Sequence, residues 1–190
     1  MATAQLTIQG APGHTYPLIS GRGMLVDQLE DLIGEAAPSS VFIISNQIVG
    51  PLYGEQLASH LPGSQLLTVP DGEQYKTLET AASLYERMLV GGADRDCLIV
   101  ALGGGVVGDL AGFVAAAYVR GIRLIQAPTS LLAMVDASIG GKVGVDLPAG
   151  KNLVGAFKDP LAVVQDHDTL ATLPAIEVRC GMAEMIKAGL

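Results

Sequence analysis

The stretch that decides the fold is residues 97–112, CLIVALGGGVVGDLAG. Its apolar start, residues 97–102, predicts a buried strand, the three glycines at 103–105 predict a tight turn, and the Ala-rich segment after Asp109 predicts a helix. A glycine turn between a strand and a helix presents backbone N–H groups at the positive end of the helix, where an anion such as a phosphate can bind. The sequence therefore predicts a phosphate-binding turn.

Gly103, Gly105 and Gly108 also satisfy the G-x-G-x-x-G pattern of dinucleotide-binding turns. Close packing of a helix on a strand is the alternative explanation of the same glycines. The dinucleotide pattern expects an acidic residue about 20 positions further on, to hold the adenine ribose. Here the first carboxylate after Asp109 is Asp136, so a ribose contact must come from another part of the chain.

The composition bounds the class of protein. The chain has 190 residues, of which 49% are hydrophobic and 16% charged, with 24 glycines, as expected of a packed α/β domain rather than a disordered chain. A net charge of −8 argues against non-specific binding to nucleic acid. The N-terminus has no signal-peptide pattern, and no apolar run reaches a membrane-spanning length. The two cysteines, Cys97 and Cys180, lie far apart in the sequence. These features predict a cytoplasmic protein with no disulfide framework.

Strand and helix patterns alternate along the chain. We expect an N-terminal hairpin, then a mostly parallel sheet with helices on both faces. The predicted strands are 5–9, 15–20, 41–45, 66–69, 97–102 and 123–128, and the predicted helices are 23–34, 51–60, 76–90, 106–118, 130–137 and 174–190.

Ligands of parallel sheets bind beyond the carboxyl ends of the strands. Four segments follow predicted strands directly: Asn46, residues 71–76, residues 103–109, and Thr129 with Ser130. The ordinary polarity of loops explains Asn46 and Thr129, but it explains the carboxylate pair Asp71 and Glu73 less well. That pair is a candidate source of the ribose contact, and one crevice would account for all four segments.

Two later segments also carry candidate chemistry. Residues 136–152 are rich in glycine and hold Lys142 and Lys151, and Lys158 follows; they suit an anionic ligand, or a glycine-rich hairpin with solvated lysines. In the terminal helix, Glu184 and Lys187 share a face, as either a metal-ligand carboxylate beside a substrate-binding lysine or a solvated ion pair. The Met and Ile face of this helix has no evident partner, so we expect a truncated chain or the first of two domains.

Three segments together resemble the 3-dehydroquinate synthases, within the wider group of sugar-phosphate cyclases. They are DGEQYK at 71–76, the stretch 103–152, which includes APTSLLAMVDASIGGKVGVDLPAGKN, and GMAEMIKAGL at 181–190. The resemblance implies a Rossmann-like NAD-binding domain over residues 1–173, and the first helix of a helical metal and substrate domain over residues 174–190, whose remainder is absent. It also implies a lyase that uses catalytic NAD and a divalent metal, zinc or cobalt, to convert 3-deoxy-D-arabino-heptulosonate 7-phosphate to 3-dehydroquinate and phosphate in the shikimate pathway.

The resemblance also implies roles for individual residues. Implied NAD contacts are Asp71, Gly72, Glu73, Gln74, Tyr75, Lys76, Gly105, Val106, Val107, Gly108, Asp109, Thr129, Ser130, Lys142, Lys151, Thr169, Leu170, Ala171 and Thr172. Implied substrate and catalytic positions are Arg120, Asp136, Lys142, Asn152 and Lys187. The implied metal ligand is Glu184.

The histidines depart from the family pattern. The family completes its metal site with two histidines of the C-terminal domain, whereas His14, His60 and His167 match no such motif. We therefore expect these 190 residues alone not to catalyse the reaction, and the full-length enzyme to be a homodimer that binds a small sugar phosphate rather than a membrane or a nucleic acid. A related sugar-phosphate cyclase and a non-catalytic NAD-binding module are the alternatives.

Overall fold

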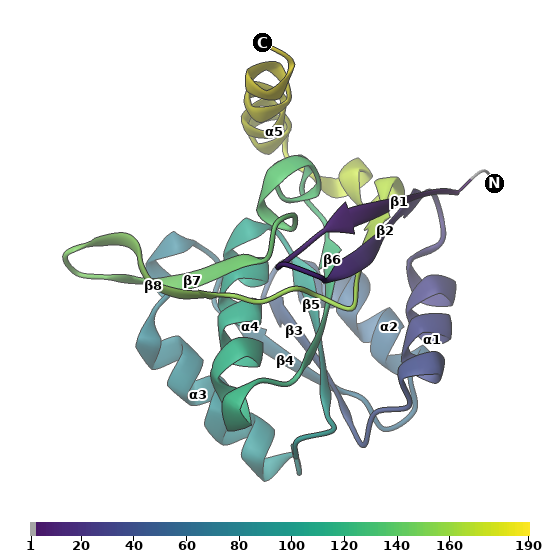
Figure 1. Cartoon of the computed structure of the whole chain (residues 1–190), viewed down its shortest axis with the longest axis vertical. Helices are drawn as coiled ribbons and strands as arrows, with labels where there is room; N and C mark the ends of the chain where they lie inside the picture. Colours follow the sequence, from purple (N-terminus) through teal and green to yellow (C-terminus); the bar gives the residue numbers. More distant parts are fainter. Residues whose placement is uncertain (1–2) are drawn as a thin grey trace.

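The computed structural model describes residues 3–190 and contains a seven-stranded sheet in the order β1-β2-β9-β6-β5-β3-β4 (Figure 1). All neighbouring strands are parallel except β1 and β2, which form the expected antiparallel hairpin. The strands are β1 (Ala4–Gln9), β2 (Thr15–Gly21), β3 (Val41–Asn46), β4 (Gln65–Val69), β5 (Leu98–Gly103), β6 (Arg123–Pro128) and β9 (Ala162–Asp166).

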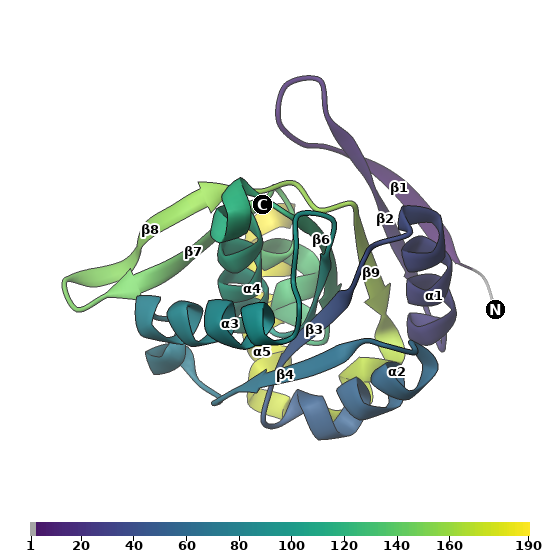
Figure 2. The same cartoon turned by 90° about the horizontal axis from the view of Figure 1, so that it is seen from below.

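Helices cover both faces of this sheet (Figures 1 and 2). The helices are α1 (Leu25–Ala36), α2 (Glu55–His60), α3 (Leu78–Val90) and α4 (Gly105–Ala117). Alternate residues of one strand enter different cores: Ile43 packs in the core under α1 and α2, whereas Phe42 and Ile44 pack in the core under α3 and α4. Burial of each such side chain stabilises the fold by roughly 1.5–3 kcal/mol. The α/β class expected from the sequence is confirmed.

A second, two-stranded sheet stands apart from the first. It is the antiparallel hairpin of β7 (Lys142–Leu147) and β8 (Gly150–Phe157), which packs on α4 (Figure 1). Gly112 of α4 permits the approach, because a Cβ there would collide with the side chain of Val143. The glycine-rich hairpin considered for residues 136–152 is therefore present.

Several local predictions need correction. Strand β9 was not predicted, although it lies inside the sheet between β2 and β6. The helix expected over 130–137 has only two α-helical residues, 131 and 132, before the π-helix η4 (Ala133–Ala137). The helix expected over 51–60 begins as the π-helix η1 (Gly50–Gly54). The helix expected from residue 76 begins at Leu78, because Thr77 caps it by accepting a hydrogen bond from the Thr80 N–H at 3.2 Å.

The last helix, α5 (Ala175–Gly189), projects from the rest of the molecule (Figure 1). It touches η4 through Gly181, which is buried against Leu131. Its large apolar side chains are exposed, among them Ile176, Met182, Met185 and Ile186. The domain boundary at 173/174 stays a prediction. Among the helices of residues 3–190, none combines the length and the apolar character needed to cross a membrane.

Candidate functional site

The carboxyl ends of β3 and β4 bring the first candidate residues together. Asn46 ends β3, and its Nδ2 donates a hydrogen bond to Oδ1 of Asp71, which follows β4, at 2.5 Å. The Asn46 Oδ1 accepts hydrogen bonds from the N–H groups of Ile48 and Val49, at 3.2 and 2.7 Å. Asp71 itself is exposed, so its carboxylate is held by Asn46 and still faces solvent.

The glycine turn lies at the neighbouring carboxyl end of β5. Helix α4 begins there at Gly105 without a side-chain cap, so the N–H groups of its first turn point out of the helix. The segment after β6 closes the other side: the Thr129 N–H donates to the Gly103 carbonyl at 2.9 Å, and a Cβ on Gly104 would lie 3.4 Å from Ser130 Oγ. An uncapped helix end with open backbone donors fits a phosphate or pyrophosphate.

The glycines of this turn serve packing as well. A Cβ on Gly103 would lie 2.7 Å from the Cβ of Val107, and one on Gly105 would lie 3.3 Å from the Cβ of Ala137. The packing explanation of the turn is therefore confirmed. Phosphate binding stays a prediction, which the open first turn of α4 allows.

A buried lysine cluster lies beside the turn. Lys76 Nζ lies 3.0 Å from Glu73 Oε1, 3.2 Å from Asp109 Oδ2, 3.6 Å from Asp146 Oδ1 and 2.7 Å from Asn152 Oδ1. These residues, called the Lys76 cluster below, come from the loop after β4, from α4 and from the hairpin. The Lys76 side chain is only 4% exposed, so the cluster joins three segments around one ammonium.

The charges in the Lys76 cluster perturb one another. Burial alone would lower the pKa of Lys76, but its hydrogen bond to Glu73 and the charge of Asp109 raise that pKa above its ordinary value. Burial raises the pKa of Asp109, although Lys76 acts in the opposite direction. For Asp146, burial raises the pKa, but the Asn152 N–H and the Lys76 charge bring the net value below normal. The ammonium is therefore charged at neutral pH.

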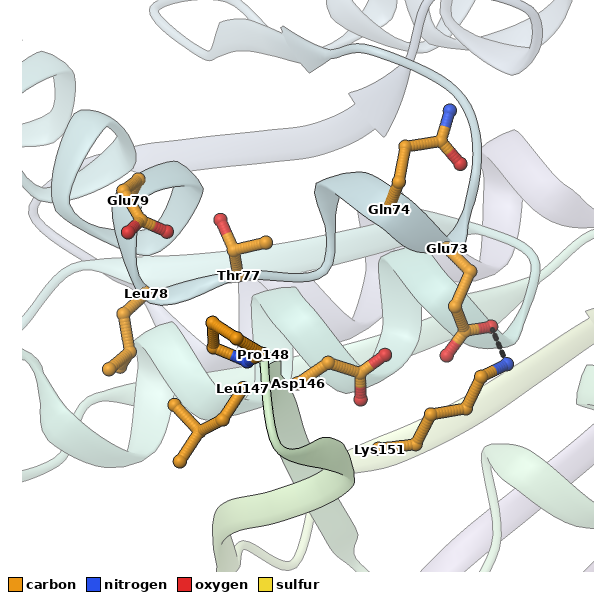
Figure 3. Close-up of a pocket in the computed structure, with 9 residues that line it drawn as sticks. All are labelled: Glu73, Gln74, Thr77, Leu78, Glu79, Asp146, Leu147, Pro148 and Lys151. Carbon is orange, nitrogen blue, oxygen red and sulfur yellow. Dashed lines mark ion pairs between the residues drawn. The ribbon is translucent and has the colours of Figure 1, made fainter.

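A pocket of about 460 Å³ opens next to this cluster (Figure 3). Its walls come from the loop after β4, the start of α3 and the turn of the hairpin. The ion pair between Lys151 Nζ and Glu73 Oε2, at 3.6 Å, closes one end of it. The lining residues are Glu73, Gln74, Thr77, Leu78, Glu79, Asp146, Leu147, Pro148 and Lys151.

The stretch expected to make further cofactor contacts follows β9 at the same edge of the sheet. It forms the 3-10 helix η5 (His167–Thr172), held by Tyr53, whose hydroxyl lies 2.7 Å from Thr172 Oγ1 and donates to the Thr169 carbonyl at 3.2 Å. A second pocket, of about 710 Å³, lies between η5, η4 and α5, and His167 lines it. His167 Nε2 is 2.8 Å from Ser20 Oγ.

The predicted metal and substrate residues of α5 form a small exposed group. Lys187 Nζ donates to Glu184 Oε2 at 2.6 Å, and the hydrogen bond and charge of Glu184, with a smaller effect of Asp136, raise the pKa of Lys187. Within residues 3–190, no three His, Cys, Asp or Glu side chains gather as a metal-binding group. The described residues therefore supply Glu184 as a single candidate ligand and do not by themselves fit a metal ion.

Two predicted substrate residues lie apart from these groups. Lys142 is exposed at the first position of β7. Arg120 lies beyond the C-terminal end of α4, close to the first residue of β6 and thus at the amino edge of the sheet, whereas the glycine turn lies at the carboxyl edge. Val119, Arg120 and Gly121 all have positive φ, at 41°, 72° and 117°. Arg120 therefore does not join the other predicted residues within this chain.

Sequence reasoning missed two residues that shape the site. Asp146 lies in the glycine-rich stretch 136–152, where the sequence assigned it no role, yet its backbone N–H donates to the Lys76 carbonyl at 2.7 Å and its carboxylate accepts from the Asn152 N–H at 2.7 Å. Tyr53 gave no signal, because its partners Thr169 and Thr172 lie more than a hundred positions away. Both act through contacts that spacing along the chain does not reveal.

The parallel sheet, the helices on both faces and the open glycine turn define a Rossmann-like α/β domain. Residues 66–180 match the family described as 3-dehydroquinate synthase N-terminal, and the chain belongs to that family. The chain is 51% identical over 181 residues to a 3-dehydroquinate synthase of Pelotomaculum thermopropionicum and 50% identical over 182 residues to one of Halorhodospira halophila. Each match covers 93% of this chain and 49% of the relative, so the chain spans about half the length of these curated relatives.

Solved structures of related cyclases share the fold. A 2-deoxy-scyllo-inosose synthase in complex with carbaglucose-6-phosphate, NAD+ and Co2+ superposes with a TM-score of 0.89 at 33% identity, over 97% of this chain and 51% of that one. ValA, a 2-epi-5-epi-valiolone synthase from Streptomyces hygroscopicus subsp. jinggangensis 5008 with NAD+ and Zn2+ bound, superposes with a TM-score of 0.81 at 34% identity, over 90% of this chain and 48% of that one.

Proposed function

We propose that this chain is the dinucleotide-binding part of a 3-dehydroquinate synthase. The whole protein would convert 3-deoxy-D-arabino-heptulosonate 7-phosphate to 3-dehydroquinate and phosphate. The observation that carries the proposal is the glycine turn of residues 103–109, whose uncapped helix end lies beside Thr129 and Ser130 and suits a pyrophosphate. Identities of about 50% to curated 3-dehydroquinate synthases support the choice of reaction.

In this proposal NAD+, when bound, supplies a hydride acceptor that is regenerated within each turnover. The turn of residues 103–109 binds the pyrophosphate, and residues 71–75 bind the adenosine end, where Asp71 offers the acidic group that the turn itself lacks. The ammonium of Lys76, which the resemblance also implies as an NAD contact, is enclosed by Glu73, Asp109 and Asn152. Thr129, Ser130, Lys142 and Lys151, together with residues 169–172, complete the cofactor contacts. All but Lys142 are placed at or beside the carboxyl edge of the sheet.

The substrate residues bind anionic oxygens and orient them. Lysine ammonium groups and the Asn152 carboxamide donate hydrogen bonds to phosphate and carboxylate groups. Lys142, Asn152 and Lys187 fill this role, and Asp136 lies between the cofactor and the substrate. Arg120 is the remaining substrate residue of the proposal. Because it lies at the amino edge of the sheet, it must reach the substrate from a different side than the other residues do.

We expect the whole protein to require a divalent metal ion, zinc or cobalt. Glu184 is the ligand that this chain would contribute. Catalytic zinc sites commonly use three protein ligands, and the described residues gather no such set. We therefore expect the 190 residues alone to be inactive. The homodimer and the cytoplasmic location of the whole protein also stay predictions.

Binding of NAD+ by this chain tests the proposal. We expect NAD+ to raise the melting temperature, since a ligand at a hundred times its Kd stabilises by about 2.7 kcal/mol. Gly105→Val places a side chain against Ala137 at the open end of α4 and should abolish the shift. Gly34→Ala, where a Cβ meets nothing within 4 Å, is the matched control and should leave the shift intact. No binding up to millimolar NAD+ contradicts the proposal.

A related sugar-phosphate cyclase is the second candidate, favoured by the close superposition on 2-deoxy-scyllo-inosose synthase. Substrate profiling of the protein encoded by the complete gene separates the two. Turnover of 3-deoxy-D-arabino-heptulosonate 7-phosphate supports the synthase, and turnover of a different sugar phosphate supports the other cyclase. A protein that binds NAD+ and turns over neither would be the non-catalytic module.

A further inference from the structure

The ammonium of Lys76 has no hydrogen-bond donor left for an outside ligand. It has three N–H donors, and three acceptors lie within hydrogen-bonding distance: Asn152 Oδ1 at 2.7 Å, Glu73 Oε1 at 3.0 Å and Asp109 Oδ2 at 3.2 Å. With a side chain only 4% exposed, Lys76 faces the protein rather than either pocket. Lys76 can therefore affect ligand binding only indirectly, through one of the residues that it contacts.

Glu73 lines a pocket as well, but Asn152 is the partner that can offer a ligand a hydrogen-bond donor. Its φ of 55° is the left-handed conformation that asparagine tolerates better than most residues. Its backbone N–H donates to Asp146 Oδ1 at 2.7 Å, so both its backbone and its side-chain oxygen are held inside the Lys76 cluster. The residue is exposed, and its Nδ2 donates no hydrogen bond within residues 3–190.

We propose that Lys76 is a positioning residue that acts through Asn152. By binding Oδ1 it fixes the orientation of the carboxamide, so that Asn152 presents its NH2 group alone. An NH2 group donates and does not accept, so the ligand group opposite Asn152 is an anionic oxygen, of a phosphate or a carboxylate. The inference rests on the proposed function, in which Asn152 contacts the sugar phosphate.

The surroundings of Lys76 suit this role. The hairpin is tied to the segment of Lys76 by its backbone as well, through the Asp146 N–H on the Lys76 carbonyl at 2.7 Å and the bridge between Thr77 and Asp146. Asp109 connects the same ammonium to the first turns of α4, next to the glycine turn. Lys76 therefore links the dinucleotide turn to the residue that presents the NH2 group.

NMR of the Asn152 side chain tests the orientation directly. The NH2 signals of Asn152 are assigned by their absence in Asn152→Ala, and we expect them to shift in Lys76→Met. Arg22→Met removes the same charge from an exposed ion pair with Asp168 and should leave them unmoved. If Lys76→Met does not fold, Lys76→Arg decides, because its planar guanidinium cannot reproduce the ammonium geometry. Unchanged NH2 signals in a folded Lys76 variant overturn the proposal.

A double-mutant cycle tests whether Lys76 affects ligand affinity through Asn152. With NAD+ in excess, the affinity of the chain for 3-deoxy-D-arabino-heptulosonate 7-phosphate is measured by NMR titration. Asn152→Ala and Lys76→Met should each weaken it, by roughly tenfold for Asn152→Ala, and the double variant should be no weaker than Asn152→Ala. Additive losses would show instead that Lys76 contacts the sugar phosphate itself.

The outcomes separate this inference from the proposed function. If the wild-type chain binds no NAD+ but the Asn152 signals respond to Lys76 as expected, the proposed function fails and the orientation of Asn152 by Lys76 stands. If NAD+ binds and the sugar phosphate leaves the Asn152 NH2 signals of the wild-type chain unmoved, the positioning role is overturned and the dinucleotide site stands.

Discussion

Two lysines of this protein pair with a glutamate three residues earlier, and their surroundings differ. Lys76 pairs with Glu73 at 3.0 Å inside a cluster where its side chain is 4% exposed. Lys187 pairs with Glu184 at 2.6 Å on α5, where its side chain is 73% exposed. The same spacing gives an ion pair in both places, but only in the first does one buried ammonium neutralise three partly buried carboxylates. The comparison shows that burial, not spacing, decides what such a pair contributes.

Lys76→Met and Lys187→Met put this comparison to its strongest test. We expect Lys76→Met to lower the free energy of unfolding by about 3–5 kcal/mol at neutral pH, because three carboxylates lose their shared cation. Lys187→Met should leave the urea midpoint unchanged, because its pair is exposed to solvent. Urea unfolding of both variants measures the difference, and equal losses would mean that the Lys76 cluster contributes no more than a surface pair.

Gly103→Ala tests the glycine turn. Its Cβ would lie 2.7 Å from the Cβ of Val107, a stiff β-branched side chain, so α4 must shift on the sheet. We expect a loss of about 1–3 kcal/mol in unfolding free energy, as for other overpacked cores. Thermal unfolding checks this, with Gly34→Ala as the control that loses nothing. A stable Gly103→Ala would show that the turn is loosely packed.

Asp166, the last residue of β9, makes the stability of the fold depend on pH. Burial alone would raise the pKa of Asp166, but hydrogen bonds from the N–H groups of Asp168, Leu25, Met24 and Gly23 bring it below the ordinary 3.8. The folded state therefore binds this proton less tightly than the unfolded chain. Its stabilisation is present above that ordinary value and is lost as the pH falls through the folded pKa.

The matched variant is Asp166→Asn. It should cost about 0.5–2 kcal/mol at neutral pH, as for loss of a helix cap, because Asp166 accepts from the first N–H groups of α1. The cost should shrink at about pH 3, which urea unfolding at the two pH values measures. A cost that is the same at both values would exclude Asp166 as the source of acid sensitivity.

Gly181→Ala should have the smallest effect on global stability. A Cβ at Gly181 would lie 2.6 Å from Leu131 Cβ and 2.7 Å from the backbone N of Leu132, so α5 must move away from η4. Because α5 has few other contacts, we expect faster hydrogen exchange within α5 and an unchanged melting temperature of the sheet. A global loss as large as that of Gly103→Ala would show that α5 is part of the core.

The sequence predicted those features that depend on neighbouring residues. Six of the seven strands of the main sheet, the N-terminal hairpin and the glycine turn follow from local patterns of apolar residues and glycines. Strand β9 was missed because Gln165 and Asp166 make its end polar, and their partners are distant: the Met134 carbonyl at 2.6 Å and the start of α1. The start of α3 could have been found from Thr77, a residue type that favours the N-cap.

The sequence named most members of the Lys76 cluster but not its geometry, and their roles in ligand binding stay predictions. The resemblance placed Glu73, Lys76, Asp109 and Asn152 among the ligand contacts, but it did not show that Lys76 joins them to one another. The cluster combines segments that spacing cannot relate, since Lys76 and Asn152 are 76 positions apart. Arg120 was grouped with the substrate residues although it lies at the other edge of the sheet.

The pairing of β2 with β9 has a consequence for how the protein is made. Leu18 pairs with Val163, and the Ala11 N–H bonds to Asp159, 148 positions away in the chain. While the ribosome is translating the middle of the chain, the N-terminal hairpin has no strand to pair with, although β3, β4 and β5 already follow one another. We therefore expect the hairpin to be protease-sensitive on stalled nascent chains and to become protected only after residue 166 has emerged from the exit tunnel.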